Sequence, residues 1–222
     1  MLYLTSRMVV APALRAVFRP TVEGAHHVPR TGGVILASNH LSFIDSIVIP
    51  MVAPRQVHFL AKASYFTGTG LKGAALRVWM TSMGMIPVER DDKRAAAKSL
   101  EIALDVLQRG GAFGIYPEGT RSRDGRLYRG RTGVAHLALE TGAPVVPVGL
   151  AGTPDIQPIG SNRPRIAHAT IRFGEPLRFA ERYADVPAGK ARRQVTDEIM
   201  DAIHGLTGQE LAGDYNEHPP TS

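Results

Sequence analysis

The sequence predicts a single α/β domain with a mixed, largely parallel sheet flanked by helices. Short apolar runs typical of buried strands alternate along the chain with longer segments of helical periodicity. The 222 residues are enough for one large domain, and 44% hydrophobic and 21% charged residues are ordinary for a globular protein. No internal linker, repeat or low-complexity segment is recognisable, so we predict that residues 20–207 form one unit.

The amino-acid composition limits the kinds of active site and of binding partner that the protein can have. The absence of cysteine excludes a thiol nucleophile, a disulfide framework and a thiolate zinc site. The net charge is +6 and comes mostly from arginine, which suits planar contacts with phosphate or carboxylate. Candidate partners are therefore nucleic acid, an anionic lipid surface or a phosphorylated small molecule. No run is long and apolar enough to span a bilayer, and we recognise no signal peptide.

Residues 1–19 are apolar, and Arg7, Arg15 and Arg19 are spaced to share one helical face. A helix that lies flat on an anionic membrane has this pattern, and so does a terminal helix packed on the domain. Pro12 interrupts the segment and allows two short helices instead of one. We predict an amphipathic, membrane-associating segment here.

Hydrophobic periodicity and turn residues place the other elements in order. The predicted strands are 21–24, 34–37, 57–61, 85–88, 112–116 and 145–150, with the alternating segment 165–173 as an edge strand. The predicted helices are about 42–50, 71–82, 93–108, 132–140 and 189–206. The polar residues 208–222, which include two consecutive prolines, are predicted to be a disordered tail.

An Asn39-His40 pair follows the buried strand 34–37 and precedes a helix. Ser42 is the predicted N-cap, which places Asp45 at the third helical position, where a carboxylate caps the turn reciprocally. His40 and Asp45 can meet only if His40 lies in the turn and folds back over the helix start. An imidazole held by a carboxylate would then lie at a strand's carboxyl end, where α/β folds place their sites. A simple helix cap also explains Asp45, and a simple turn explains the Asn-His pair.

Lys62, Arg90 and Arg121 each follow another predicted strand. Because the carboxyl ends of parallel strands lie at one edge of the sheet, we expect these side chains around one cleft with His40. Guanidinium groups in that cleft would bind a phosphate dianion through charge-assisted bonds. Taken singly, an ion pair with a neighbouring aspartate explains Arg90, and a solvated basic loop explains residues 121–131.

Residues 68–73 match the pattern G-x-G-x-x-G of dinucleotide-binding proteins. In that motif the first glycine follows the strand directly, whereas four residues intervene here, and the helix that follows is short. A loop between strand and helix is the better explanation, and a nucleotide-dependent oxidoreductase remains the alternative.

Four motifs, in order, resemble those of the glycerolipid acyltransferases, the 1-acylglycerol-3-phosphate acyltransferase family. They are Asn39-His40-x4-Asp45, Gly84-Met85-Ile86-Pro87-Val88-Glu89-Arg90, Glu118-Gly119-Thr120-Arg121-Ser122 and Val145-Val146-Pro147-Val148. The resemblance covers about residues 22–174 and implies a glycerol-3-phosphate acyltransferase-like fold.

The resemblance implies transfer of an acyl chain from acyl-coenzyme A or acyl carrier protein to a hydroxyl of lysophosphatidate, in phospholipid biosynthesis. His40 would be the general base, and Asp45 would hold its tautomer and stabilise the imidazolium. A backbone N–H at Gly119 would support the oxyanion. The implied substrate-binding residues are Asn39, Lys62, Arg90, Glu118, Gly119, Thr120 and Arg121. No metal and no cofactor is implied.

The expected partners are lysophosphatidate, an acyl thioester and an anionic membrane, with no nucleic acid. We expect peripheral or monotopic attachment at the cytoplasmic face of the cell membrane. Two alternatives stay open beside the oxidoreductase. One is a family member that uses glycerol 3-phosphate or another lysophospholipid, and the other is a non-enzymatic basic module that binds membrane or nucleic acid.

Overall fold

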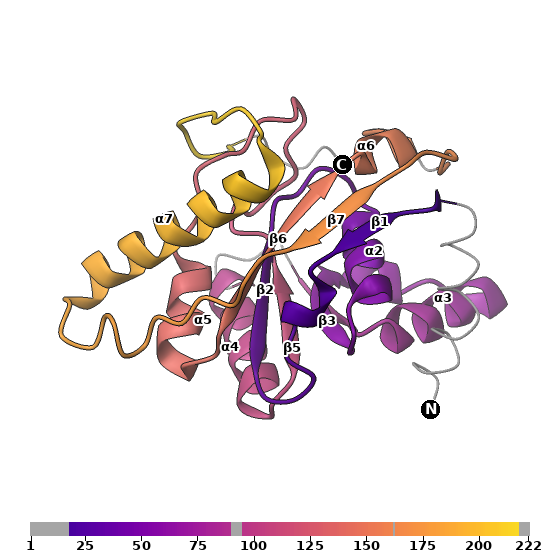
Figure 1. The fold of residues 1–222 in the computed structure, drawn as a ribbon. Coiled ribbons are helices and arrows are strands. Elements are labelled where there is room, and N and C mark those ends of the chain that lie inside the picture. Colours follow the sequence, from indigo (N-terminus) through magenta and orange to yellow (C-terminus); the bar gives the residue numbers. More distant parts are fainter. Residues whose placement is uncertain (1–17, 90–94, 162, 218–222) are drawn as a thin grey trace.

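The computed structural model describes residues 18–89, 95–161 and 163–217, which form a seven-stranded sheet with helices on both faces (Figure 1). The strands are β1 (Thr21–Glu23), β2 (Val34–Ser38), β3 (Val57–Lys62), β4 (Met85–Val88), β5 (Ala112–Ile115), β6 (Val145–Ala151) and β7 (Thr170–Phe173). The α-helices are α2 (Asp45–Val52), α3 (Gly70–Ser82), α4 (Ala95–Gln108), α5 (Gly133–Thr141), α6 (Thr153–Ile156) and α7 (Ala188–Thr207). Two 3-10 helices, η1 (Ala25–His27) and η2 (Ala63–Phe66), complete the described elements.

The strand order is β1-β7-β6-β2-β5-β3-β4. The strands from β6 to β4 run parallel, whereas β7 pairs antiparallel with β6 and parallel with β1. The predicted mixed, largely parallel sheet is therefore confirmed. The carboxyl ends of these five parallel strands share one edge, and β2 is the middle strand of the whole sheet.

The prediction of an edge strand at residues 165–173 is wrong. Only Thr170–Phe173 form β7, and β1 lies outside it at the edge, with Thr21 opposite Thr170. The alternation that suggested an edge has a different cause. Ile171 and Phe173 are buried in the core, whereas the side chains between them are only partly covered, as expected when one face of a strand is packed.

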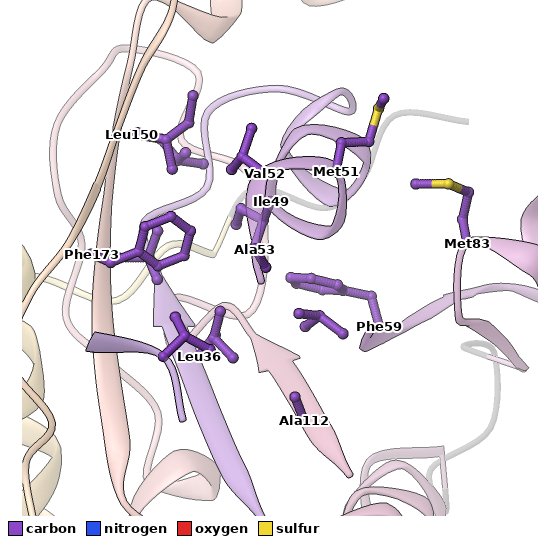
Figure 2. Close-up of a cluster of buried hydrophobic side chains, with 14 of the residues drawn as sticks. Leu36, Ile49, Met51, Val52, Ala53, Phe59, Met83, Ala112, Leu150 and Phe173 are labelled. Carbon is purple, nitrogen blue, oxygen red and sulfur yellow. The ribbon is translucent and has the colours of Figure 1, made fainter. Parts of the chain in front are cut away.

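Strand β2 is buried along its whole length because both faces of the sheet are covered. Val34 and Leu36 point into one hydrophobic cluster, which includes side chains of α2 and α3 (Figure 2). Ile35 and Ala37 point into a second cluster on the opposite face, where α4, α5 and α7 pack. The central strand is thus held on both sides, and its carboxyl end is a rigid support for the residues that follow.

The glycine pattern at residues 68–73 has a packing explanation. Gly68 follows η2, not a strand, and a Cβ on Gly73 would collide with the Gly68 carbonyl. These glycines therefore allow the turn and the first turn of α3 to approach each other closely.

Several expectations concern residues outside the described ranges. They are the N-terminal segment up to residue 17, Arg90, the aspartate pair at 91–92 and residues 218–222.

Candidate active site

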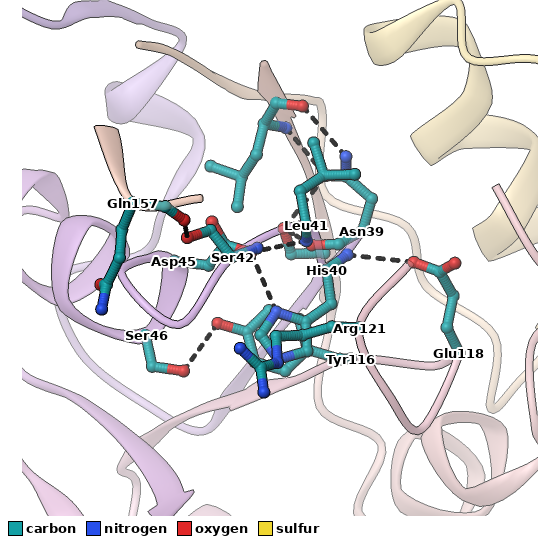
Figure 3. Close-up of polar contacts among 12 residues, drawn as sticks. Asn39, His40, Leu41, Ser42, Asp45, Ser46, Tyr116, Glu118, Arg121 and Gln157 are labelled. Atoms are coloured by element: carbon teal, nitrogen blue, oxygen red, sulfur yellow. Dashed lines mark hydrogen bonds and ion pairs between the residues drawn. The ribbon is translucent and has the colours of Figure 1, made fainter. Parts of the chain in front are cut away.

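The imidazole of His40 and the carboxylate of Asp45 meet at the carboxyl end of β2 (Figure 3). His40 Nδ1 lies 2.9 Å from Asp45 Oδ2. The same oxygen accepts the backbone N–H groups of Leu41 at 2.7 Å and Ser42 at 2.8 Å. Because a carboxylate oxygen only accepts hydrogen bonds, Nδ1 carries the proton and Nε2 is left as an acceptor.

The turn differs from the predicted one. Asp45 is the first residue of α2, and Ile44 occupies the N-cap position. Ser42 does not cap the helix, since its hydroxyl donates to the Gln157 carbonyl at 2.7 Å. The predicted contact from the Asp45 carboxylate back to the turn is confirmed, because it accepts the N–H groups of Leu41 and Ser42.

The two side chains differ in their exposure to solvent. Asp45 is fully buried, whereas the His40 side chain is 15% exposed. Asp45 Oδ1 is buried without a hydrogen-bond partner among the described residues, so the donors on Oδ2 compensate its charge. The buried carboxylate is thus held by fixed donors, and it bonds to the edge of an imidazole that reaches solvent.

Tyr116, at the end of β5, was not identified from the sequence. Its ring stacks on His40 with centroids 3.8 Å apart and planes 8° apart, and Phe59 packs near it at 5.4 Å. Its hydroxyl lies 2.9 Å from Ser46 Oγ, and burial raises the pKa of the phenol well above its usual value, so the ring stays neutral. A tyrosine at a strand end beside the third motif is the signal that could have identified it.

Glu118 and Ser122 hold the backbone of His40 from two sides. Glu118 Oε1 accepts the His40 N–H at 3.0 Å, and Oε2 accepts the Tyr128 N–H at 3.0 Å. The Ser122 N–H donates to the His40 carbonyl at 2.8 Å. Glu118 is fully buried, and its expected role in substrate binding stays a prediction. Burial also raises the pKa of Glu118 to about 7.

The expected oxyanion role of the Gly119 backbone stays a prediction. Its N–H donates to the Tyr116 carbonyl at 3.0 Å and is therefore already used. The residue adopts φ +81°, and a Cβ there would lie 3.0 Å from Arg131 Nε. Glycine is required at this position because it forms a tight left-handed turn under Arg131.

Asn39 also has a structural position instead of a place in the cleft. It is fully buried, and its amide nitrogen donates to the Leu150 carbonyl at 3.0 Å and to Gln209 Oε1 at 2.8 Å. Its oxygen accepts the Leu150 N–H at 2.8 Å. These bonds fasten β2 to β6 and to the chain that follows α7.

The predicted phosphate-binding cations differ in their positions relative to His40. Arg121 is partly exposed and precedes Ser122, and Figure 3 shows its side chain projecting in the same direction as the imidazole of His40. Thr120 beside it is also partly exposed. Lys62 is exposed at the end of β3, two strands away from β2. Arg90 lies outside the described residues, so the expected cluster is described for His40 and Arg121 alone.

The prediction of a disordered tail is wrong for residues 209–217, which lie against the loop 121–131. The backbone of this segment bonds to Leu127 and Arg129, and Asn216, only 3% exposed, donates to the Arg121 carbonyl at 3.1 Å. The loop has polar backbone groups that no strand pairs, and the C-terminal segment supplies their partners.

A cavity of about 570 Å³ opens beside Tyr116. Its walls come from β3, β5, α4 and α5 and are mostly apolar, with the Arg131 side chain among the few polar groups. The lining residues are Phe59, Leu60, Val88, Ala96, Ser99, Leu100, Phe113, Gly114, Ile115, Tyr116, Pro117, Gly119, Arg131, Thr132, Gly133, Val134 and Leu137. An apolar space therefore lies beside Tyr116, whose ring stacks on His40.

Residues 19–151 match the family model described as Acyltransferase. The chain belongs to this family. A chloroplastic 1-acyl-sn-glycerol-3-phosphate acyltransferase, LPAT1 of Arabidopsis thaliana, is 30% identical over 186 residues, which are 82% of this chain and 49% of the relative. A 1-acyl-sn-glycerol-3-phosphate acyltransferase of Borreliella burgdorferi is 32% identical over 132 residues, which are 60% of this chain and 51% of the relative. The chain thus spans about half the length of the curated relatives it matches.

The crystal structure of the 1-acyl-sn-glycerophosphate (LPA) acyltransferase PlsC from Thermotoga maritima has the same fold. The TM-score is 0.67 at 22% sequence identity, over 91% of this chain and 81% of the other. The similarity supports the α/β architecture of this acyltransferase-family chain.

None of the helices in the described part of this family member combines the length and the apolar character that a bilayer crossing needs. Among the same residues, no three His, Cys, Asp or Glu side chains cluster as metal ligands would.

The raised pKa of Glu118 predicts a specific pH dependence of stability. The folded carboxyl keeps its proton to about pH 7, whereas the unfolded group loses it near 4.5, so its stabilising contribution is complete below 4.5 and is lost as the pH rises to 7. Glu118→Gln removes this titration. Urea unfolding followed by circular dichroism at pH 5 and pH 8 should show a smaller loss of stability for the variant than for the wild type. Glu140→Gln, at an exposed position, is the control, and an equal loss in Glu118→Gln contradicts the assignment.

The C-terminal segment is predicted to protect the arginine-rich loop 121–131. A chain that ends after Thr207 loses the hydrogen bonds to this loop, and each is worth about 1 kcal/mol, or about fivefold in local opening. Trypsin should therefore cleave the loop at least about tenfold faster than in the full chain. A chain that ends after Glu217 keeps the contacts and should be cleaved at the wild-type rate, and equal rates for both truncations refute the role.

Proposed function

We propose that this chain transfers an acyl group from an acyl thioester to a hydroxyl of lysophosphatidate in phospholipid biosynthesis. The observation that supports it most is the His40–Asp45 pair, whose geometry leaves Nε2 as an acceptor. The His40 ring stacks on Tyr116, and Tyr116 lines the apolar cavity. The family supports the reaction class, and the printed names of the curated relatives support this acceptor.

His40 Nε2 would take the proton of the acceptor hydroxyl as its oxygen attacks the thioester carbonyl. The tetrahedral intermediate then expels the thiolate, which takes the same proton back from the imidazolium. Asp45 stabilises the imidazolium in between, as a carboxylate does in hydrolase triads. The acyl group passes directly between the substrates, and the enzyme forms no covalent bond to it.

The residues around His40 would lower the free-energy barrier to acyl transfer by fixing the orientation of its ring. Asp45 holds the ring edge, Tyr116 holds its face, and the bonds from Glu118 and Ser122 hold its backbone. A base held in this way needs little reorganisation when the hydroxyl arrives. Glu118 therefore acts here as a positioning residue.

Arg121 would bind the acceptor phosphate, with Arg90 and Lys62 as further candidate cations and Thr120 as a neutral neighbour. Guanidinium groups suit a phosphate because they form paired, charge-assisted hydrogen bonds. The cavity beside Tyr116 would take the acyl chain of the donor, which is carried by coenzyme A or acyl carrier protein. No cofactor is needed for this chemistry.

We further propose that the enzyme acts as a peripheral or monotopic protein at the cytoplasmic face of the cell membrane. The lipid acceptor resides in the membrane, and the apolar, arginine-containing residues 1–19 have the composition of an interfacial segment. Residues 20–207 would form the acyltransferase domain.

His40→Ala tests the proposed reaction. It should lower the rate of acyl transfer to lysophosphatidate by about 10²- to 10⁴-fold, because positioned proton transfer is worth that much. Circular dichroism checks the fold, and His26→Ala, at an exposed histidine in η1, should stay near wild-type activity. Full activity in His40→Ala would refute the mechanism, whereas anion binding independent of His40 with no acyl transfer would favour a basic binding module.

Gly133→Leu tests whether the cavity holds the acyl chain. Gly133 lines the cavity, and a Cβ there would have only Leu100 within reach, at 3.4 Å, so a larger side chain has room to enter. Losing space for about two methylene groups, at about 0.8 kcal/mol each, should lower kcat/KM for long-chain donors about tenfold and spare short ones. Gly205→Leu, at an open position on α7, is the control. An unchanged chain-length profile in Gly133→Leu contradicts this use of the cavity.

A further inference from the structure

Exposed apolar side chains gather on one part of the surface. Four of the large hydrophobic residues that the structure shows as exposed belong to η2 and α3: Tyr65 (39%), Leu71 (91%), Leu76 (42%) and Val78 (53%). Figure 1 shows α3 at the opposite end of the molecule from α7. Single exposed hydrophobic residues need no explanation, but a group on one helix does.

The apolar side chains of α3 form a stripe that faces solvent. Leu71, Ala75 and Val78 follow the spacing i, i+4, i+7 of one helical face, and all three are exposed. The opposite side of the helix packs on the domain through Gly73 and Met80, which are buried. Helix α3 therefore has two apolar sides. One side packs on the domain, and the other has no partner among the described residues.

The charged side chains of α3 itself have one sign. Residues 46–88 contain no Asp or Glu. Lys72 and Arg77 are exposed on the two flanks of the stripe, and Lys62 is exposed just before η2. An exposed apolar stripe flanked by cations is what an anionic lipid surface attracts, because side chains enter the headgroup boundary while cations bind lipid phosphates.

We propose that the η2–α3 surface, residues 63–66 and 70–82, docks the protein on an anionic lipid bilayer. It would act in addition to any attachment through residues 1–19. The inference rests on the proposed function only in taking the substrate to be a lipid, and vesicle binding is measurable without activity.

The surface adjoins the candidate active site. Tyr65 of η2 makes an edge contact with Phe43, with ring centroids 5.5 Å apart. Phe43 lies in the turn between His40 and Asp45. Docking through η2 and α3 would therefore hold the imidazole close to the lipid layer, where an acceptor with an acyl chain can approach without leaving the membrane.

A second copy of the chain is a poorer partner for this surface. In a symmetric dimer, Lys72 and Arg77 would face the same cations of the other copy, and segment 46–88 offers no carboxylate to pair them. Charge complementarity thus favours lipid phosphate over self-association.

Trp79 makes the test specific, since it is the chain's single tryptophan and lies partly exposed on α3. With full-length protein, phosphatidylglycerol vesicles should shift its emission to the blue and brominated lipid should quench it, whereas phosphatidylcholine vesicles should do much less. The double variants Leu71→Ser/Val78→Ser and Lys72→Glu/Arg77→Glu should each weaken vesicle affinity about tenfold or more. Leu211→Ser, 57% exposed beside loop 121–131, is the matched control and should bind as wild type.

Two further measurements separate the outcomes. Light scattering reports the oligomeric state, and acyl transfer to lysophosphatidate in detergent micelles reports the active site. Wild-type vesicle affinity in both double variants overturns the proposal, as does a change in oligomeric state with no change in vesicle binding. Lost vesicle binding with retained micellar activity supports it. Absence of acyl transfer in every variant refutes the proposed function, and the vesicle result still decides the docking surface.

Discussion

One buried carboxylate oxygen organises the centre of this molecule. Asp45 Oδ2 accepts hydrogen bonds from the His40 ring and from two successive backbone N–H groups, and its side chain is closed off from solvent. A carboxylate buried without such donors would be strongly destabilising, so the turn, the start of α2 and the orientation of the imidazole are formed together. The same contacts leave one ring nitrogen with an acceptor lone pair, which is the property that a general base requires.

Around this centre, residues of the third motif, 118–122, hold the backbone of the first motif in place. Glu118 and Ser122 bond the backbone of His40, and Gly119 forms the turn that makes this possible. The C-terminal segment then covers the loop through Asn216 and reaches Asn39 through Gln209. Much of the polar character of the site is therefore internal support, and Arg121 and the exposed edge of His40 are left to meet ligands.

Two groups of cations in this chain have different surroundings. The loop 121–131 is rich in arginine and bonds to the His40 backbone, and we propose that its guanidinium groups bind the acceptor phosphate. The cations of residues 62–77 flank exposed apolar side chains on another surface, where fluid lipid headgroups are the better match. Net charge in the sequence does not distinguish these two uses, whereas the position of each cation beside a cavity or an apolar stripe does.

The sequence by itself determined the architecture and the chemical pair. Buried strands and helices have strong periodicity, so β2 to β6 and the main helices were predicted to within a few residues, and His40 was correctly paired with Asp45 because the contact is local. Only the tertiary structure decided what lies around the pair. The stacking of Tyr116, the burial of Glu118 and Asn39, and the order of residues 209–217 all depend on contacts between segments 75 to 170 residues apart, which periodicity and motif spacing do not encode. A polar residue in a motif has the same appearance in the sequence whether it faces a ligand or satisfies a buried backbone group, and burial alone distinguishes the two cases.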